Sequence, residues 1–190
     1  MTYSLSDDIT AFLAVRPEMG PSRIRDDPVR VPQKAGLYGW WFSTIPAVVP
    51  LDGTLEANGY RLLYVGIAPQ KPAKSGSRSA RTLRDRLLNH CRGPSASSTL
   101  RRTLISLLKS ELDLNVGRTS SGKMKLDKAD ESKLSAWMDG NARATWLIHA
   151  VPWEVEDGLI SGSIGLPLNI KGSSNAFAAE LSRLRRVARD

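Results

Sequence analysis

The segment Lys34–Phe42, KAGLYGWWF, decides how the chain folds, and it is apolar and aromatic after its first residue, with two glycines. Such a composition predicts a β-strand over Ala35–Phe42. Because successive side chains of a strand point to opposite faces, Tyr38 and Trp40 share one face while Trp41 takes the other. A tyrosine in a core strand either packs or reacts, and the rest of the sequence decides which.

Two further segments predict strands that pair with this one. Tyr60–Ile67, YRLLYVGI, follows a predicted loop at Ser43–Asn58, where two prolines and a glycine interrupt any helical period. Ala144–Val151, ATWLIHAV, is the third apolar run of strand length. The sequence therefore predicts a small three-stranded antiparallel sheet.

Helical patterns surround these strands. Helices are predicted for residues 4–15, 80–91, 99–112, 128–140, 152–164 and 174–189. Serines precede several of them as candidate caps, namely Ser4 or Ser6, Ser97 or Ser98, and Ser174. Because sheet and helices are segregated rather than regularly alternating, the predicted class is α+β.

The remaining segments are shorter. Residues 113–126 predict an inserted hairpin around a Ser-Ser-Gly turn, residues 166–170 a short extended piece, and the proline-rich residues 16–33 an irregular stretch. We expect one domain over residues 1–190, with a core at about 35–170 and the helices 4–15 and 174–189 as additions.

Positive charge is clustered along the chain, which carries a net charge of +8. Between Arg78 and Lys109 there are eight cationic residues and a single acid, Asp85, and four more arginines lie between Arg183 and Arg189. Clustered positive charge attracts polyanions, of which nucleic acid is the commonest. The candidates for nucleic-acid contact are Arg81, Arg84, Arg92, Arg101 and Arg102.

Several classes of protein and site are excluded by composition. A single cysteine, Cys91, excludes an internal disulfide and a cysteine zinc site, and it fits a reducing compartment. No apolar run is long enough to span a membrane, and the first residues lack the basic region of a signal peptide. We therefore expect a cytoplasmic protein with no membrane partner.

The segment Gly117–Met124, GRTSSGKM, nearly spells a phosphate-binding P-loop. Its last position is Met124, which has no hydroxyl for a magnesium ion, and the polar residues that follow do not begin a core-facing helix. A glycine-serine turn in a basic hairpin accounts for the same letters. We therefore interpret the segment as a hairpin.

Two triplets on the first two predicted strands carry a stronger signal. Gly36-Leu37-Tyr38 and Tyr64-Val65-Gly66 resemble the paired signature of the GIY-YIG nuclease family, with Leu and Val in place of the two isoleucines. In that family a helix after the second triplet presents an arginine and, one turn later, a histidine or tyrosine. Arg86 and His90 fit at i and i+4, which places both on one helix face. Arg84 is the alternative to Arg86.

The family pattern continues toward the end of the chain. A metal-binding glutamate on a helix is followed by an apolar pair, a proline and an asparagine, and the segment PWEVEDGLISGSIGLPLN offers Glu156 and Asn169 for these places. Glu154 is the fallback ligand. Small stand-alone bacterial members share the segments STLR, WMxxNA and LPLN, which stand here at residues 98–101, 137–142 and 166–169. The chain departs from those members at residues 175–177, which read Asn-Ala-Phe without the usual His-Pro.

The resemblance implies a metal-dependent endonuclease that hydrolyses DNA phosphodiester bonds and leaves a 5′-phosphate and a 3′-hydroxyl. By this resemblance Tyr38 is the general base, with its hydroxyl in a cleft, Tyr64 and His90 position the water and the phosphate, and Asn169 holds the site together. Glu156 would bind Mg²⁺ or Mn²⁺, since magnesium commonly takes one carboxylate plus waters and substrate oxygens.

Arg86 would clamp the phosphate with its planar guanidinium. A tyrosine base needs nearby cations, because its unperturbed pKa is about 10.

Two other functions stay open. The first is a non-catalytic nucleic-acid-binding or assembly module on the same fold, because each candidate residue taken alone is commonly structural. The second is a ribonuclease acting on structured RNA, because the charge pattern suits RNA as well as DNA.

Overall fold

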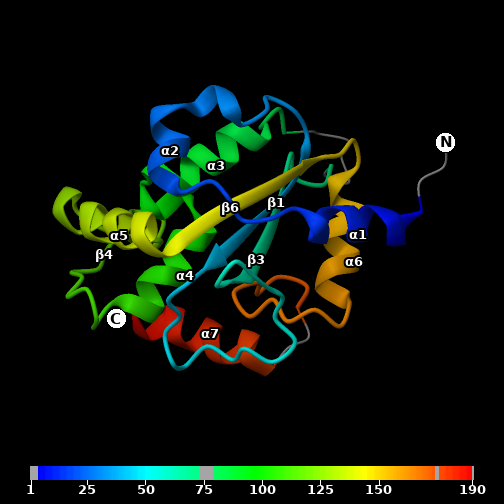
Figure 1. Cartoon of the computed structure of the whole chain (residues 1–190). Helices are drawn as coiled ribbons and strands as arrows, with labels where there is room; N and C mark the ends of the chain where they lie inside the picture. Colours follow the sequence, from blue (N-terminus) through cyan, green and yellow to red (C-terminus); the bar gives the residue numbers. More distant parts are fainter. Residues whose placement is uncertain (1–3, 73–78, 174–175, 190) are drawn as a thin grey trace.

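A computed structural model describes residues 4–72, 79–173 and 176–189 of the chain. Its centre is an antiparallel sheet of four strands in the order β2-β3-β1-β6 (Figure 1). The strands are β1 (Gly36–Phe42), β2 (Glu56–Ala57), β3 (Tyr60–Ala68) and β6 (Ala142–Ile148). The α+β class and the three expected strands are confirmed.

The fourth strand corrects the predicted count of three. β2 occupies the end of the predicted loop and pairs Ala57 with Tyr60 across the two-residue turn Asn58-Gly59. Both turn residues have positive φ, 54° for Asn58 and 76° for Gly59. Asn-Gly is the favoured pair for a hairpin turn whose two central residues are both left-handed, so this strand had a readable local signal.

The helices bury apolar stripes on both faces of the sheet. They are α1 (Leu5–Ala14), α2 (Pro21–Asp26), α3 (Leu83–Arg92), α4 (Thr99–Leu108), α5 (Lys128–Asn141), α6 (Pro152–Ser161) and α7 (Ala176–Val187). One cluster of buried side chains joins α2, α3, α4, α5 and α7 to the sheet face that carries Tyr38 and Trp40. A second cluster joins α1 and α6 to the opposite face, which carries Leu37 and Trp41.

The stretch 16–33 was predicted to be irregular, and this prediction is wrong. It contains α2 and a 3₁₀-helix at Pro28–Arg30, and each begins with a proline in its first turn. A proline is tolerated at that position because its missing N–H would have no partner within the helix. The prolines of this stretch therefore mark helix starts.

The predicted inserted hairpin is confirmed. β4 (Gly117–Arg118) pairs with β5 (Met124–Lys125), and the turn between them is closed by a hydrogen bond from the Gly122 N–H to the Thr119 carbonyl. The letters that resemble a P-loop therefore form a hairpin tip, as interpreted from the sequence.

Segments outside the strands cover both edges of the sheet. On the β6 side the Ala144 N–H donates to the Met19 carbonyl at 2.8 Å. On the β3 side the Leu168 N–H donates to the Leu63 carbonyl at 3.0 Å. The predicted extended piece 166–170 is thus a loop that runs along β3, and it is not a further strand.

No helix in the described ranges has both the length and the apolar character needed to cross a membrane. The predicted cap at Ser174 and the cation Arg78 lie outside the described residues.

Candidate active site

Tyr38 and His90 form the buried centre of the site. Tyr38 lies on β1 and His90 on α3, and neither residue has any exposed surface. The Tyr38 hydroxyl is 2.9 Å from His90 Nε2, and His90 Nδ1 is 2.7 Å from the Ser98 hydroxyl. The expectation that the Tyr38 hydroxyl faces an open cleft is wrong for this structure, because the hydroxyl is enclosed and bonded to His90.

The Tyr38–His90–Ser98 chain of hydrogen bonds has two possible proton arrangements. A neutral imidazole donates from one nitrogen only. Either Tyr38 donates to Nε2 while Nδ1 donates to Ser98, or Ser98 donates to Nδ1 while Nε2 donates to Tyr38. The Ser98 hydroxyl also accepts from the Arg101 N–H at 3.1 Å as the N-cap of α4. The sequence indicated Ser98 as a candidate cap but not as a partner of His90.

A capping box fixes where α3 begins and therefore where its side chains point. Thr82 accepts from the Asp85 N–H, and Asp85 accepts from the Thr82 N–H, which satisfies two otherwise unpaired groups at the helix start. Arg86 and His90 follow one turn apart, and Arg86 Nη2 lies 3.5 Å from the Tyr38 hydroxyl. The alternative, Arg84, donates instead to the Val31 carbonyl, so the geometry favours Arg86.

Arg86 is half-buried and incompletely paired. Its Nε is buried without a hydrogen-bond partner in the described part of the chain. The nearby Tyr38 hydroxyl raises the pKa of Arg86, and burial acts in the opposite direction. A buried donor without a partner is unusual in a folded protein, and here it marks a place where an anion would be bound favourably.

Glycines at the ends of the two triplets allow the close packing of Tyr38. Tyr38 is paired across the strands with Gly66, and a Cβ atom at position 66 would lie 2.5 Å from the Tyr38 hydroxyl oxygen. At Gly36 a Cβ would overlap the Leu147 carbonyl and lie 2.8 Å from Leu83 Cδ1. Gly66 of the second triplet therefore makes room for the tyrosine of the first, and Gly36 makes room for the neighbouring strand β6 and for Leu83.

The remaining candidates come from elsewhere in the chain. Tyr64 lies on β3 with its ring centroid 6.4 Å from that of Tyr38. Glu156 lies on α6, half-buried, and its carboxylate has no hydrogen-bond or ion-pair partner among the described residues, while its charge acts on Tyr38, Tyr64 and Arg86. Glu154, the fallback, is exposed.

Asn169 acts on the backbone of the second triplet. Its Oδ1 accepts from the Val65 N–H and its Nδ2 donates to the Val65 carbonyl, both at 2.9 Å. Val65 is the middle residue of the triplet, so these two bonds fix the strand next to Tyr64.

Five of the six candidate side chains thus lie close together or act on one another electrostatically, namely Tyr38, Tyr64, Arg86, His90 and Glu156. The sixth, Asn169, fixes the strand that carries Tyr64. A family model described as the GIY-YIG catalytic domain matches residues 36–187 of this 190-residue chain. The chain belongs to the GIY-YIG nuclease family. No curated protein and no solved structure matches it significantly.

The two tyrosines of this GIY-YIG domain are buried beside one cation, Arg86. Burial raises the pKa of both phenols, and the pKa of Tyr64 is raised well above its usual value, with the Tyr38 charge as the second cause. Arg86 lowers the pKa of Tyr38 by its charge and its hydrogen bond. Arg86 also lowers the pKa of Tyr64 by its charge, so this cation opposes the effect of burial on both phenols.

The other titratable groups of the site are also shifted. Burial holds the pKa of His90 well below its ordinary value, with Arg86 and Arg101 adding to the effect, so the imidazole is neutral. Burial raises the pKa of Glu156 to about 7, Asp157 adds to this, and Lys171 and Arg86 oppose it. The Cys91 thiol is buried with a pKa raised to about 12, which excludes it as a nucleophile near neutral pH.

The donor set of the GIY-YIG domain suits a hard cation that retains most of its waters. Within the described ranges no group of three or more His, Cys, Asp or Glu side chains could hold a metal ion. Glu156 offers a single oxygen ligand, and magnesium typically binds through one or two carboxylates with waters and substrate phosphates. A single carboxylate at Glu156 is compatible with a hydrated divalent cation of this kind.

The predicted nucleic-acid contacts fall into three groups. Arg81 and Arg92 are exposed, while Arg84 and Arg102 are half-buried and donate to backbone carbonyls. Arg101 is fully buried and paired with Glu131 at 2.6 Å. The prediction that Arg101 contacts nucleic acid is therefore corrected, because its guanidinium has no exposed surface.

Proposed function

We propose that this GIY-YIG domain is a divalent-metal-dependent endonuclease that hydrolyses phosphodiester bonds in DNA. The observation that carries the proposal is the convergence of Tyr38, Arg86 and Glu156, which come from β1, α3 and α6 and act on one another electrostatically. A base, a cation for the phosphate and a metal-binding carboxylate are the groups that phosphodiester hydrolysis requires.

In the proposed reaction the oxygen of a water attacks the phosphorus, and the bond from phosphorus to the 3′ oxygen breaks. Tyr38 acts as the phenolate, whose negative charge Arg86 stabilises, and it takes the proton of the attacking water. The departing 3′ oxygen takes a proton from solvent water. Burial raises the pKa of Tyr64 well above its usual value, so Tyr64 keeps its proton and can donate a hydrogen bond. The products are a 5′-phosphate and a 3′-hydroxyl.

The other residues bind and orient in this scheme. Arg86 has a free Nε donor with which to contact a nonbridging phosphate oxygen. The neutral His90 holds the Tyr38 hydroxyl, and Asn169 fixes the strand that carries Tyr64. A metal ion bound at Glu156 would supply Lewis-acid stabilisation of the leaving oxygen.

A nicking assay on supercoiled plasmid tests the proposal, with Mg²⁺, Mn²⁺ or chelator added to wild type, Glu156→Gln and Glu154→Gln. We expect metal-dependent nicking by the wild type, a loss of at least about 100-fold in Glu156→Gln, and near-wild-type activity in the matched control Glu154→Gln. Equal activity of all three proteins contradicts the assignment of the metal ligand.

One observation favours a second function, a non-catalytic nucleic-acid-binding module. The Tyr38 hydroxyl is fully buried and already bonded to His90, so a water reaches it only after local rearrangement. A gel-shift assay beside the nicking assay separates the two functions. DNA that is retarded but uncut under every metal condition favours the binding module, and digestion of RNA in parallel shows which nucleic acid is preferred.

A further inference from the structure

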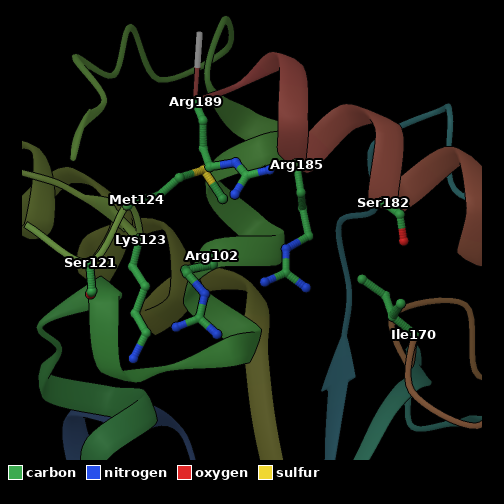
Figure 2. A pocket seen from close by; sticks show the side chains of 9 residues that line it. Arg102, Ser121, Lys123, Met124, Ile170, Ser182, Arg185 and Arg189 are labelled. Carbon is green, nitrogen blue, oxygen red and sulfur yellow. The ribbon is translucent and has the colours of Figure 1, made fainter. Parts of the chain in front are cut away.

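A cationic hollow lies beside the active site, between α4, the β4–β5 hairpin and α7 (Figure 2). It has a volume of about 320 Å³, and four cations line it, namely Arg102, Lys123, Arg185 and Arg189. Among the described residues that line it there is no acidic side chain. Figure 2 shows the Lys123, Arg102 and Arg185 side chains reaching into the same space from the three elements.

The cations of this hollow have no ion-pair partner in the described part of the chain. The Arg185 guanidinium has no hydrogen bond or ion pair with any described residue, and burial lowers its pKa, with Arg102 and Arg189 adding to the effect. Arg102 is held in place by a 2.6 Å bond to the Ala96 carbonyl, which offers no negative charge. Like charges gathered in a half-buried place favour the binding of an anion.

The hollow is next to the catalytic groups. Arg102 belongs to α4, whose cap Ser98 contacts His90, and Ile170 on the rim follows Asn169 directly. The charges of Arg102 and Arg185 are both close enough to Tyr64 for that phenol to raise their pKa. Tyr64 is thus within electrostatic reach of both Arg86 and the hollow.

We propose that this hollow is a subsite for a backbone phosphate of the substrate strand that flanks the phosphate to be cleaved. The inference rests on the proposed function for the class of substrate. Guanidinium groups bind phosphate oxygens through paired donors, and Lys123 adds a mobile point charge. The volume equals that of roughly ten waters, which is enough for a phosphodiester with its hydration.

The subsite gives a role to two features of the sequence. The hairpin tip that resembles a P-loop contributes Ser121 and Lys123, and the closing basic run contributes Arg185 and Arg189. In a P-loop, backbone N–H groups at the start of a helix bind the phosphates of a nucleotide. In this hollow the positive charge comes from side chains instead.

The main test compares Arg185→Gln with Arg186→Gln, since Arg186 is the next residue of α7 and does not line the hollow. Both are made in a Glu156→Gln background so that a short labelled DNA duplex is bound without being cut. We expect Arg185→Gln to weaken DNA binding about tenfold. The slope of the logarithm of the association constant against the logarithm of the salt concentration should become shallower by about 0.9, the value for one lost phosphate contact. We expect Arg186→Gln to change binding by less than about twofold.

A second pair guards against misfolding of the α7 variants. Lys123→Ala removes an exposed lysine of the hollow, and Lys125→Ala removes one two residues later that does not line it. Only Lys123→Ala is expected to weaken binding. In the active enzyme, Arg185→Gln is expected to raise KM with kcat within about twofold, because the residue touches no reacting atom.

The outcomes separate this inference from the proposed function. If the wild type cuts DNA while both members of each pair bind alike, the subsite is overturned and the nuclease stands. If binding depends on Arg185 but no metal supports cutting, the nuclease is overturned and the subsite stands. If inorganic phosphate binds through Arg185 while duplex binding is unchanged in both pairs, the hollow takes free anions and the subsite is overturned.

Discussion

Two arginines of this domain, the fully buried Arg101 and the half-buried Arg86, are surrounded in opposite ways. All three side-chain nitrogens of Arg101 donate hydrogen bonds, to partners that include Glu131 and the His90 carbonyl. Arg86 makes one long side-chain contact, at 3.5 Å to Tyr38, and its Nε has no partner in the described part of the chain.

From this difference we infer that Arg101 stabilises the fold, whereas Arg86 has a donor left with which to bind a ligand. A buried charge with complete pairing serves the folded chain, and its removal leaves the partner charge uncompensated. A buried charge with an unused donor contributes little to folding and can be paired by substrate. The same substitution at the two positions should therefore separate activity from stability.

The largest expected effect is on the activity of Arg86→Met. Losing the proposed phosphate contact is expected to lower kcat for plasmid nicking by about 100- to 1000-fold, because under the proposed function this donor is aimed at transition-state charge. The free energy of unfolding is expected to change by less than about 1 kcal/mol, since the lost contact is long and a buried unpaired donor is removed. Rates and urea denaturation curves of the purified variant measure both quantities.

For Arg101→Met, by contrast, the large effect is expected on stability. The substitution leaves the Glu131 carboxylate without its buried partner, and such a loss costs about 3–5 kcal/mol of unfolding free energy. The double variant Arg101→Met/Glu131→Leu should recover part of this loss, because no unpaired charge remains. If Arg86→Met unfolds as readily as Arg101→Met in urea, the comparison between the two arginines does not hold.

The smallest effect concerns the pH dependence of stability. Burial depresses the pKa of folded His90, whereas the unfolded chain has a histidine pKa of about 6.5. Below that value the unfolded state binds more protons than the folded state, so the unfolding free energy falls as the pH drops below about 6.5 and is unaffected by His90 above it.

Urea denaturation at a series of pH values checks this expectation for His90. The fall in unfolding free energy below about pH 6.5 should be shallower in His90→Gln than in the wild type. His149→Gln is the matched control, because His149 pairs with Asp8 away from the Tyr38 cluster, and it should keep the contribution of His90. Parallel curves for the wild type and His90→Gln would mean that His90 carries a proton in the folded state.

Local sequence patterns predicted the parts of the molecule that local interactions determine. The strand at Gly36–Phe42, the helix that carries Arg86 and His90 one turn apart, and the hairpin at 117–125 lie where the patterns placed them. The Asn58-Gly59 turn shows that β2 also had a local signal, although the loop prediction overlooked it.

Which arginines are buried could not be decided in the same way. Arg101 and Arg102 are neighbours with the same charge, yet one is enclosed and the other lines the cationic hollow. Arg101 shares a helix face with Leu104, Ile105 and Leu108, and this spacing hints at burial. Its acceptor, Glu131, is thirty residues away on α5, and no local pattern indicates that partnership.

The covered edges of the sheet have a consequence for how the protein behaves at high concentration. An exposed strand edge is a template onto which a second molecule can add its own strand. Here Met19 takes the place of a neighbour for β6, and Leu168 with the Asn169 amide does so for β3. The Asn169 side chain, which fixes the strand next to Tyr64, thus also helps to prevent separate copies of the protein from pairing through their sheet edges.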